Sequence, residues 1–269
     1  MPDLPFSATT PIHVGRVGLR ARDGEALAGY YKKLLGLTET RRSGATIALG
    51  AEGRELLEIE HAPTAKPDDP RSAGLFHTAF LLPRREDLAR WVGHAMANSM
   101  QIAGASDHHV SEAIYLNDPE GNGIEIYADR PQEAWERPGG RIAMTTDRLD
   151  VESLLATLPG DDSGWQGAPD GSVIGHVHLR AGDVDAAERW WNELGLETMV
   201  HYGSQAVFLA SGGYHHHIGA NIWQSRGAGP RALDRAGLSF VEMVATDANG
   251  ERQMPDPWGT EIRIVPGHA

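Results

Sequence analysis

Two stretches that lie 160 residues apart, "GRVGLRARD" (15–23) and "GHVHLRAGD" (175–183), carry the same residue at six of their nine positions. Both alternate apolar and polar residues, as half-buried strands do. Each leads into a helical pattern with an aromatic pair and a closing glycine, "GEALAGYYKKLLGL" and "VDAAERWWNELGL". Short strand-like segments follow in both copies. The repeat therefore predicts a βαβββ unit of about 50 residues as the building block of the fold.

Four such modules fit the chain, at residues 12–61, 74–129, 174–224 and 237–266. The second begins at "GLFHTAFLLP", and the last, at "AGLSFVEMVATD", lacks a helical pattern. The segment 131–172 is rich in proline, glycine and aspartate, which is typical of a linker, and has one short helical pattern near "DRLDVESLLATL". We therefore predict an α+β fold with four modules in two paired half-barrel domains, residues 1–130 and 173–269, joined by this linker.

Composition narrows the function classes. The 269 residues include 37 Asp and Glu against 24 Lys and Arg, a net charge of −13, which argues against a nucleic-acid partner. The chain has no cysteine, so any metal must be held by histidine and carboxylate. No stretch reaches the roughly 20 apolar residues of a membrane helix, and the N-terminus does not resemble a signal peptide. We expect a cytoplasmic protein with no membrane partner.

Polar side chains on the first and last strands of paired modules should converge on a concave face. The second and third modules offer His77, Glu125 and His176 at inward positions. Two histidines and one carboxylate form the facial arrangement that holds Fe(II) and leaves other positions open. The first and fourth modules supply a set that makes no such site: Arg16 and Glu58, with Phe240 and either Arg263 or Glu261.

A hairpin in the second module, "HHVSEAIYLNDPEGNGIEIY" (108–127), adds two candidates. Its centre, "NDPEGNG", has the residues of a tight turn. If the hairpin folds symmetrically about Glu120, Tyr115 lies opposite Glu125. The spacing of His108, Tyr115, "DPEG" and Glu125 closely resembles the motif of extradiol ring-cleaving dioxygenases. These enzymes belong to the vicinal oxygen chelate superfamily, with glyoxalase I and bleomycin-resistance proteins, and the four-module layout resembles their catechol 2,3-dioxygenase branch.

The resemblance implies an oxidoreductase of aromatic catabolism, an extradiol dioxygenase that cleaves a catechol-type ring with O₂. It implies Fe(II) as cofactor, with Mn(II) left open, and an aromatic diol and O₂ as small-molecule partners. His77, His176 and Glu125 match the metal ligands. Tyr115 and His108 match groups near the substrate and oxygen. A homo-oligomer is left open.

Three consecutive histidines, at 215–217, lie 39 to 41 residues after His176. In the family, a histidine about forty residues beyond the first ligand of its module serves as acid and base. Alternation from Asn221 along a strand predicts that His215 and His217 share the inward face, with His217 favoured as the acting residue. His216 points away by this alternation and joins Trp223 and Tyr127 as a candidate for the substrate pocket.

Three alternatives are left open. In one of them the metal site is merely structural, and the other two use the same scaffold for another function. A glyoxalase-type metal isomerase or lyase usually has more carboxylate ligands, and it lacks the pair Tyr115 and His108. A non-catalytic protein that sequesters a small molecule, as resistance proteins do, has no need of a complete His-His-Glu set. The sequence leaves open the ring substituent, the identity of the metal and the oligomeric state.

Overall fold

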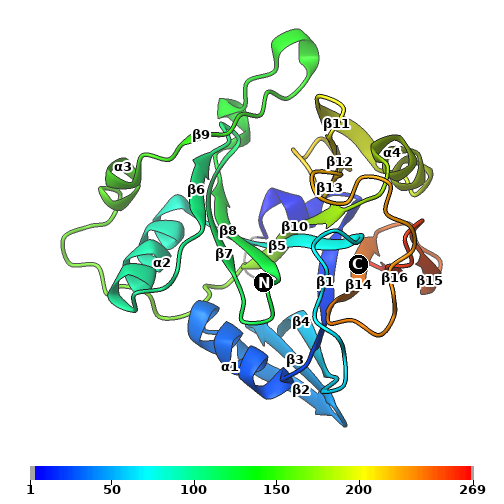
Figure 1. Cartoon of the computed structure of the whole chain (residues 1–269). Helices are drawn as coiled ribbons and strands as arrows, with labels where there is room; N and C mark the ends of the chain where they lie inside the picture. The colour runs from blue at the N-terminus through cyan, green and yellow to red at the C-terminus, as the bar shows by residue number, and fades with distance from the viewer. Residues whose placement is uncertain (1–3, 268–269) are drawn as a thin grey trace.

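The computed structural model describes residues 4–267 and contains all four predicted modules (Figure 1). The first has the elements β1 (Ile12–Ala21), α1 (Gly24–Leu35), β2 (Thr38–Ser43), β3 (Thr46–Ala51) and β4 (Arg54–His61). The second has β5 (Gly74–Leu82), α2 (Arg85–Ala97), β6 (Gly104–Asp107), β7 (Ser111–Asn117) and β8 (Gly123–Asp129). The third has β10 (Val173–Arg180), α4 (Val184–Glu193), β11 (Glu197–Tyr202), β12 (Ala206–Ala210) and β13 (Ile218–Asn221).

The fourth module consists of β14 (Gly237–Ala245), β15 (Arg252–Pro255) and β16 (Glu261–Pro266), and the absence of a helix between residues 237 and 266 confirms the prediction. Short 3₁₀ helices lie at Phe6–Thr9, Gln132–Ala134 and Pro138–Gly140. The segment predicted as a linker contains β9 (Asp147–Arg148) and one short helix, α3 (Val151–Leu155), which packs against α2 (Figure 1). The predicted helix in this segment is therefore confirmed.

The aspartate shared by the two quoted repeats begins a helix in each copy. Asp23 accepts a hydrogen bond from the backbone N–H of Ala26, and Asp183 accepts one from Ala186, each 3.0 Å or shorter. Such N-caps satisfy amide groups that have no partner inside the helix. At the other end of α1, Gly36 adopts a left-handed conformation, φ 71°, which glycine adopts without steric cost. The repeat therefore records the local signals that start and stop the helices.

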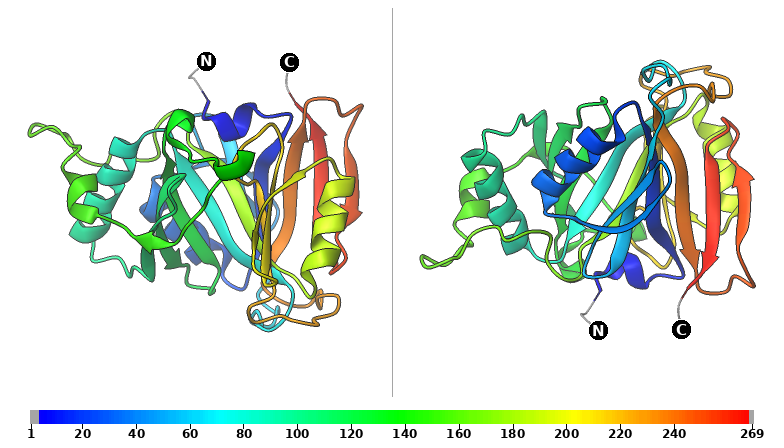
Figure 2. Two further views of the ribbon diagram at one scale, coloured as in Figure 1. Left: turned by 90° about the horizontal axis from the view of Figure 1, so that it is seen from above. Right: turned by 90° about the horizontal axis from the view of Figure 1, so that it is seen from below.

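The strands form two curled sheets, and each sheet is built from two modules. The first and fourth modules form a seven-stranded sheet in the order β15-β16-β14-β1-β4-β3-β2. The second and third form a nine-stranded sheet in the order β11-β12-β13-β10-β5-β8-β7-β6-β9. Figure 2 shows the orange and red strands from the C-terminal end beside the blue β1. We call these sheets barrel one and barrel two.

This topology confirms the α+β fold of paired half-barrels. Each barrel contains strands from both sides of the 131–172 segment, because β1 pairs with β14 and β5 pairs with β10. The division of the chain at residues 130 and 173 therefore does not coincide with the division into sheets, and those domain boundaries stay a prediction. A shared apolar core includes Val17 and Leu57 of barrel one and Val177 of barrel two. Within residues 4–267, no helix is long and apolar enough to cross a membrane.

Candidate metal centre and active site

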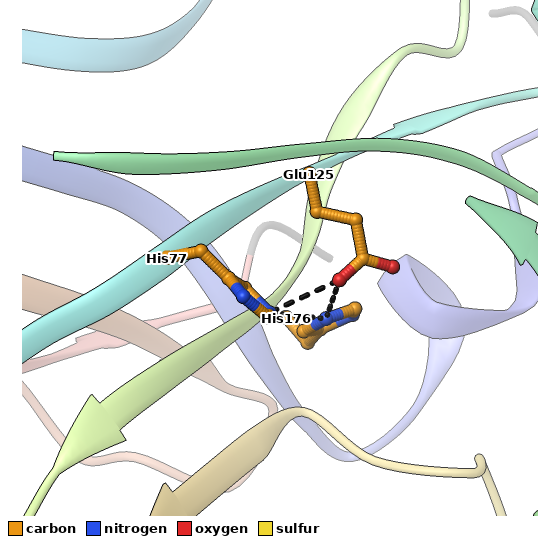
Figure 3. Close-up of side chains that lie close together, drawn as sticks. All are labelled: His77, Glu125 and His176. Carbon is orange, nitrogen blue, oxygen red and sulfur yellow. Dashed lines mark hydrogen bonds and ion pairs between the residues drawn. The ribbon is translucent and has the colours of Figure 1, made fainter. Parts of the chain in front are cut away.

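Three strands of barrel two bring the predicted ligands together. In β10 and β5, which are antiparallel, His178 pairs with His77; in β5 and β8, which are parallel, Ala79 pairs with Glu125. This register points His77, Glu125 and His176 toward one another (Figure 3). The Nε2 atom of His77 lies 3.0 Å from Oε2 of Glu125 and 3.3 Å from Nε2 of His176. The Nε2 atom of His176 lies 3.2 Å from the same carboxylate oxygen.

The electrostatics of this cluster favour a neutral imidazole beside a carboxylate anion. Burial lowers the pKa of His176 to about 4 despite the nearby Glu125. Burial by itself raises the pKa of Glu125, but His176 and His77 hold the net value well below the usual range. Nδ1 of His176 is buried and has no hydrogen-bond partner within residues 4–267. Neutral imidazole nitrogens and a carboxylate are the protonation states in which these groups ligate metals.

The hairpin places Tyr115 directly opposite Glu125, as predicted. The hydroxyl of Tyr115 lies 2.6 Å from Nε2 of His108, and Nδ1 of His108 lies 2.6 Å from the backbone carbonyl oxygen of Thr145. A carbonyl only accepts, so Nδ1 carries the proton, and in the neutral ring Nε2 accepts the hydroxyl proton of Tyr115. Burial, with Glu125 nearby, raises the pKa of Tyr115 well above its usual range. The phenol is therefore protonated at neutral pH and fixed in direction.

The structure corrects the predicted orientation of the histidine run. His216, not His217, lines the cavity beside the cluster, and its ring centroid lies 4.0 Å from that of His176. His217 faces the N-terminal segment, where its Nε2 lies 3.0 Å from the carbonyl oxygen of Ser7 and 3.1 Å from Oγ1 of Thr10. The strand β13 begins only at Ile218. Strand alternation from Asn221 therefore does not extend back to the histidines, which is why the prediction was wrong.

His215 is also buried away from the cavity wall, against the prediction. Its Nε2 lies 2.9 Å from Oδ1 of Asp129, and its Nδ1 lies 2.8 Å from Nδ1 of His216. The three histidines therefore have three different surroundings: Asp129 for His215, the cavity for His216 and the N-terminal 3₁₀ helix for His217.

The two aromatic residues predicted for the pocket differ in position. Trp223 lines the cavity and is 41% exposed, at its edge. Tyr127 is fully buried and does not line it, because its hydroxyl pairs with that of Tyr214 at 2.8 Å, behind His176. Tyr127 shares the inward face with Glu125 but lies one step deeper, where the barrel is filled by side chains.

The cavity has a volume of about 500 Å³, within the range of small-molecule sites. Sequence reasoning missed two parts of its wall. The first is an aromatic side made by Phe76 and Phe208 together with Trp223. The second is the stretch Met144–Thr146, in the segment predicted as a linker, which also holds His108. No periodic pattern marked this stretch, because it is held by tertiary contacts and not by a long strand or helix.

His178 is a further missed member of the wall, although a signal existed, since it lies two residues after His176 on the same strand. The side-chain oxygen of Asn221 accepts the backbone N–H of Trp223, so its amide nitrogen faces Nε2 of His178 at 3.1 Å. Nε2 is therefore an acceptor and the ring is neutral. Burial also holds the pKa of His178 well below its usual range.

Barrel one presents different residues at the equivalent positions. The register of β1, β14 and β16 matches that of β10, β5 and β8, so that Arg16 stands where His176 does. Phe240 stands at the position of His77, and Arg263 at that of Glu125. This register selects Arg263 over Glu261. Arg16 contacts Glu55 at 2.5 Å and Glu242 at 2.7 Å, and the Arg263 guanidinium lies 3.5 Å from the centroid of the Phe240 ring.

Comparison with known proteins assigns the chain to a family. A sequence model of the glyoxalase/bleomycin resistance protein/dioxygenase superfamily matches residues 13–126. Over 241 residues, 86% of this chain and 82% of the relative, the sequence is 39% identical to a catechol-2,3-dioxygenase from Bacillus subtilis (strain 168). This chain belongs to that superfamily. The family predicted from the hairpin motif is confirmed, on its extradiol dioxygenase branch.

Other known proteins show a weaker similarity. A biphenyl-2,3-diol 1,2-dioxygenase 2 from Rhodococcus globerulus is 29% identical over 37% of this chain, and the match spans 58% of that protein. The crystal structure of a putative dioxygenase from Bacillus subtilis has a TM-score of 0.60 at 13% identity, over 96% of this chain and 85% of that one. Glyoxalase I from Zea mays has a TM-score of 0.58 at 12% identity, over 97% and 94%. These solved structures share the fold.

Proposed function

We propose that the protein is a metal-dependent extradiol dioxygenase that opens the ring of a catechol-type diol with O₂. One observation carries the proposal: His77, His176 and Glu125 present their ligand atoms within 4.8 Å of one another, in a cavity that also contains His216 and the Tyr115–His108 pair. Both oxygen atoms of O₂ enter the ring-opened product, so the reaction needs no external reductant.

The residues fit a resident metal ion. Three buried atoms, two imidazole nitrogens and one carboxylate oxygen, face one another at 3.0 to 3.3 Å. A metal ion can accept the lone pairs of all three atoms at once. A two-histidine, one-carboxylate set is typical of non-haem Fe(II) sites. When bound, the ion supplies positive charge that lowers the pKa of a diol hydroxyl. His77, His176 and Glu125 would hold it.

The other side chains of the cavity have separate roles. His216 is neutral, because burial holds its pKa well below the usual range, so it can accept a hydroxyl proton of the diol and return it to the opening product. The Tyr115 hydroxyl donates to His108, so its oxygen can accept a hydrogen bond from a hydroxyl of the diol, and His108 sets its direction. The aromatic wall excludes water from the ring.

Two observations favour this function over the alternatives. Within residues 4–267, Glu125 is the only carboxylate that lines the cavity, whereas a glyoxalase-type isomerase or lyase usually has a second. A protein that only sequesters a small molecule has no use for the chain from Tyr115 through His108 to Thr145. Iron in preference to manganese, a place in aromatic catabolism, a cytoplasmic location and any homo-oligomer remain predictions.

The test is oxygen uptake by anaerobically purified protein, loaded with Fe(II) or Mn(II), on addition of catechol. We expect one O₂ consumed per diol and a ring-opened product that absorbs visible light. A His216→Gln variant should retain its metal and turn over about 10²–10⁴-fold more slowly, because an amide cannot transfer the proton. Conversion of a hemithioacetal without O₂ uptake would instead support the isomerase.

A further inference from the structure

We propose that Asp129 and His215 are positioning residues that fix the tautomer of His216, so that the unprotonated Nε2 of His216 faces the cavity. Asp129, His215 and His216 are connected in a row by hydrogen bonds, and His216 lies at the candidate site. Its consequence for catalysis rests on the proposed function, whereas the tautomer itself does not.

Asp129 and His215 are in direct contact. Oδ1 of Asp129 lies 2.9 Å from Nε2 of His215. An ionised carboxylate has only acceptor atoms, so Nε2 of His215 must carry a proton. The His215 side chain is 0% exposed and the Asp129 side chain 18% exposed, which keeps water from competing for this hydrogen bond.

The neighbouring rings of His215 and His216 are also in contact. Nδ1 of His215 lies 2.8 Å from Nδ1 of His216. In a neutral imidazole one nitrogen donates and the other accepts. In a neutral His215 whose Nε2 donates to Asp129, Nδ1 is the acceptor. Nδ1 of His216 must then carry the proton that joins the two rings.

The other nitrogen of His216 is free to accept a proton. With the proton on Nδ1, Nε2 of His216 has a lone pair, and within residues 4–267 it has no hydrogen-bond partner in the protein. The ring lines the cavity and lies 4.0 Å, between centroids, from the ring of His176. A base is thus held next to the candidate metal centre with its accepting atom unoccupied.

This arrangement follows the logic of a triad, in which a carboxylate sets the tautomer of a catalytic histidine. Here a second histidine stands between the carboxylate and the base. When His216 takes a proton from the diol on Nε2, its Nδ1–H remains paired with His215. The pair therefore steadies both protonation states of His216 without moving heavy atoms.

The tautomers can be observed without turnover. In protein labelled with ¹⁵N-histidine and loaded with diamagnetic Zn(II), long-range ¹H–¹⁵N spectra distinguish a protonated nitrogen from an unprotonated one. We expect Nδ1–H and bare Nε2 for His216, and Nε2–H and bare Nδ1 for His215. A doubly protonated His215 with the proton of His216 on Nε2 would overturn the proposal.

Kinetics supply a second test on the Fe(II)-loaded enzyme. His215→Leu removes the acceptor and should lower kcat about 10- to 100-fold, with KM and metal content unchanged. His215→Asn keeps an acceptor oxygen near the position of Nδ1 and should recover most of this loss. His201→Asn makes the same substitution at an exposed histidine and serves as the control, with kcat expected to be unchanged. Equal kcat in the Leu variant and the wild type would overturn the positioning role.

The two tests separate the two ideas. If the spectra show the expected tautomers but no diol is cleaved, the proposed function fails and the tautomer assignment stands. If diols are cleaved but the spectra show Nε2–H on His216, the proposed function stands and the assignment fails.

Discussion

Barrels one and two share a strand layout but present opposite chemistry on their concave faces. At three equivalent positions, barrel two has His176, His77 and Glu125 where barrel one has Arg16, Phe240 and Arg263. The cations of barrel one are paired with glutamates or stacked on an aromatic ring, so that face is internally neutralised. The same backbone thus supports a candidate metal centre on one side and an ion-paired interior on the other. Three side chains decide the difference.

The largest expected effect is the loss of metal from barrel two when one of its three ligands is replaced. Alanine at His77, His176 or Glu125 should lower the metal content of the purified protein at least about ten-fold. Even the mutation of a residue that only hydrogen-bonds a metal ligand lowers metal affinity about 10–100-fold. Elemental analysis measures this, and Glu58→Gln in barrel one is the matched control. Wild-type metal content in His77→Ala, or metal found near Glu58 or Glu261, would show that the ligands are wrongly assigned.

The second effect concerns acid stability, since barrel two is rich in buried histidine. Burial lowers the pKa of His217 to about 3. The unfolded chain takes up this proton near pH 6.5 and the folded protein only near pH 3, so the free energy of unfolding should fall as pH drops through that window. We expect a loss of roughly 2–4 kcal/mol from this residue.

Urea unfolding between pH 7.5 and 4 measures this loss. His217→Gln should be less stable at pH 7.5 but show a flatter dependence on pH, whereas the exposed His201→Gln should leave the slope unchanged. An unchanged slope in His217→Gln would assign the acid sensitivity to other groups.

The third effect uses the contrast in charge. Within residues 4–267, no lysine or arginine lines the cavity of barrel two, whereas Arg20, Arg231, Arg235 and Arg263 line one in barrel one. A substrate carboxylate would therefore be buried without a partner in barrel two, at a large cost in free energy. We expect alkyl-substituted catechols to have kcat/KM values roughly 10- to 100-fold above those of carboxylated ones.

A gain-of-charge variant makes this expectation sharper. Val200→Arg places a cation on the cavity wall and should reduce the ratio of kcat/KM for alkyl-substituted over carboxylated catechols. Val200→Leu should leave this ratio unchanged. Equal kcat/KM for the two classes in the wild-type enzyme would contradict the argument.

The smallest effect lies in barrel one. Arg16→Met leaves Glu242 without its cation, whereas Glu55 keeps its ion pair with Arg41. Because the side chains of Arg16 and Glu242 are 15–18% exposed, we expect the free energy of unfolding to fall by only about 1–2 kcal/mol. Metal content and turnover should not change. Thermal unfolding compared with Arg71→Met, which removes an exposed partner of Asp69, checks this. A fall in metal content in Arg16→Met would show that the two barrels are coupled.

The internal repeat, the α+β class, the missing helix of the fourth module and the facing of Tyr115 and Glu125 were all predictable from the sequence. Each depends on local periodicity or on a turn whose residues fix its geometry, such as "NDPEGNG". The convergence of His77, His176 and Glu125 was also predictable, because strand alternation at equivalent repeat positions determines which side chains face inward.

Only the tertiary structure decided three other features of the site. These are the orientation of His215–His217, the burial of Tyr127 and the contribution of Met144–Thr146 to the cavity. Residues 211–217 form no regular strand, so no period relates their side chains to the inward face. Their directions come instead from partners far along the chain, Asp129 for His215 and Ser7 and Thr10 for His217. Local patterns determine which atoms a strand or hairpin can present, whereas long-range hydrogen bonds determine where an irregular segment points them.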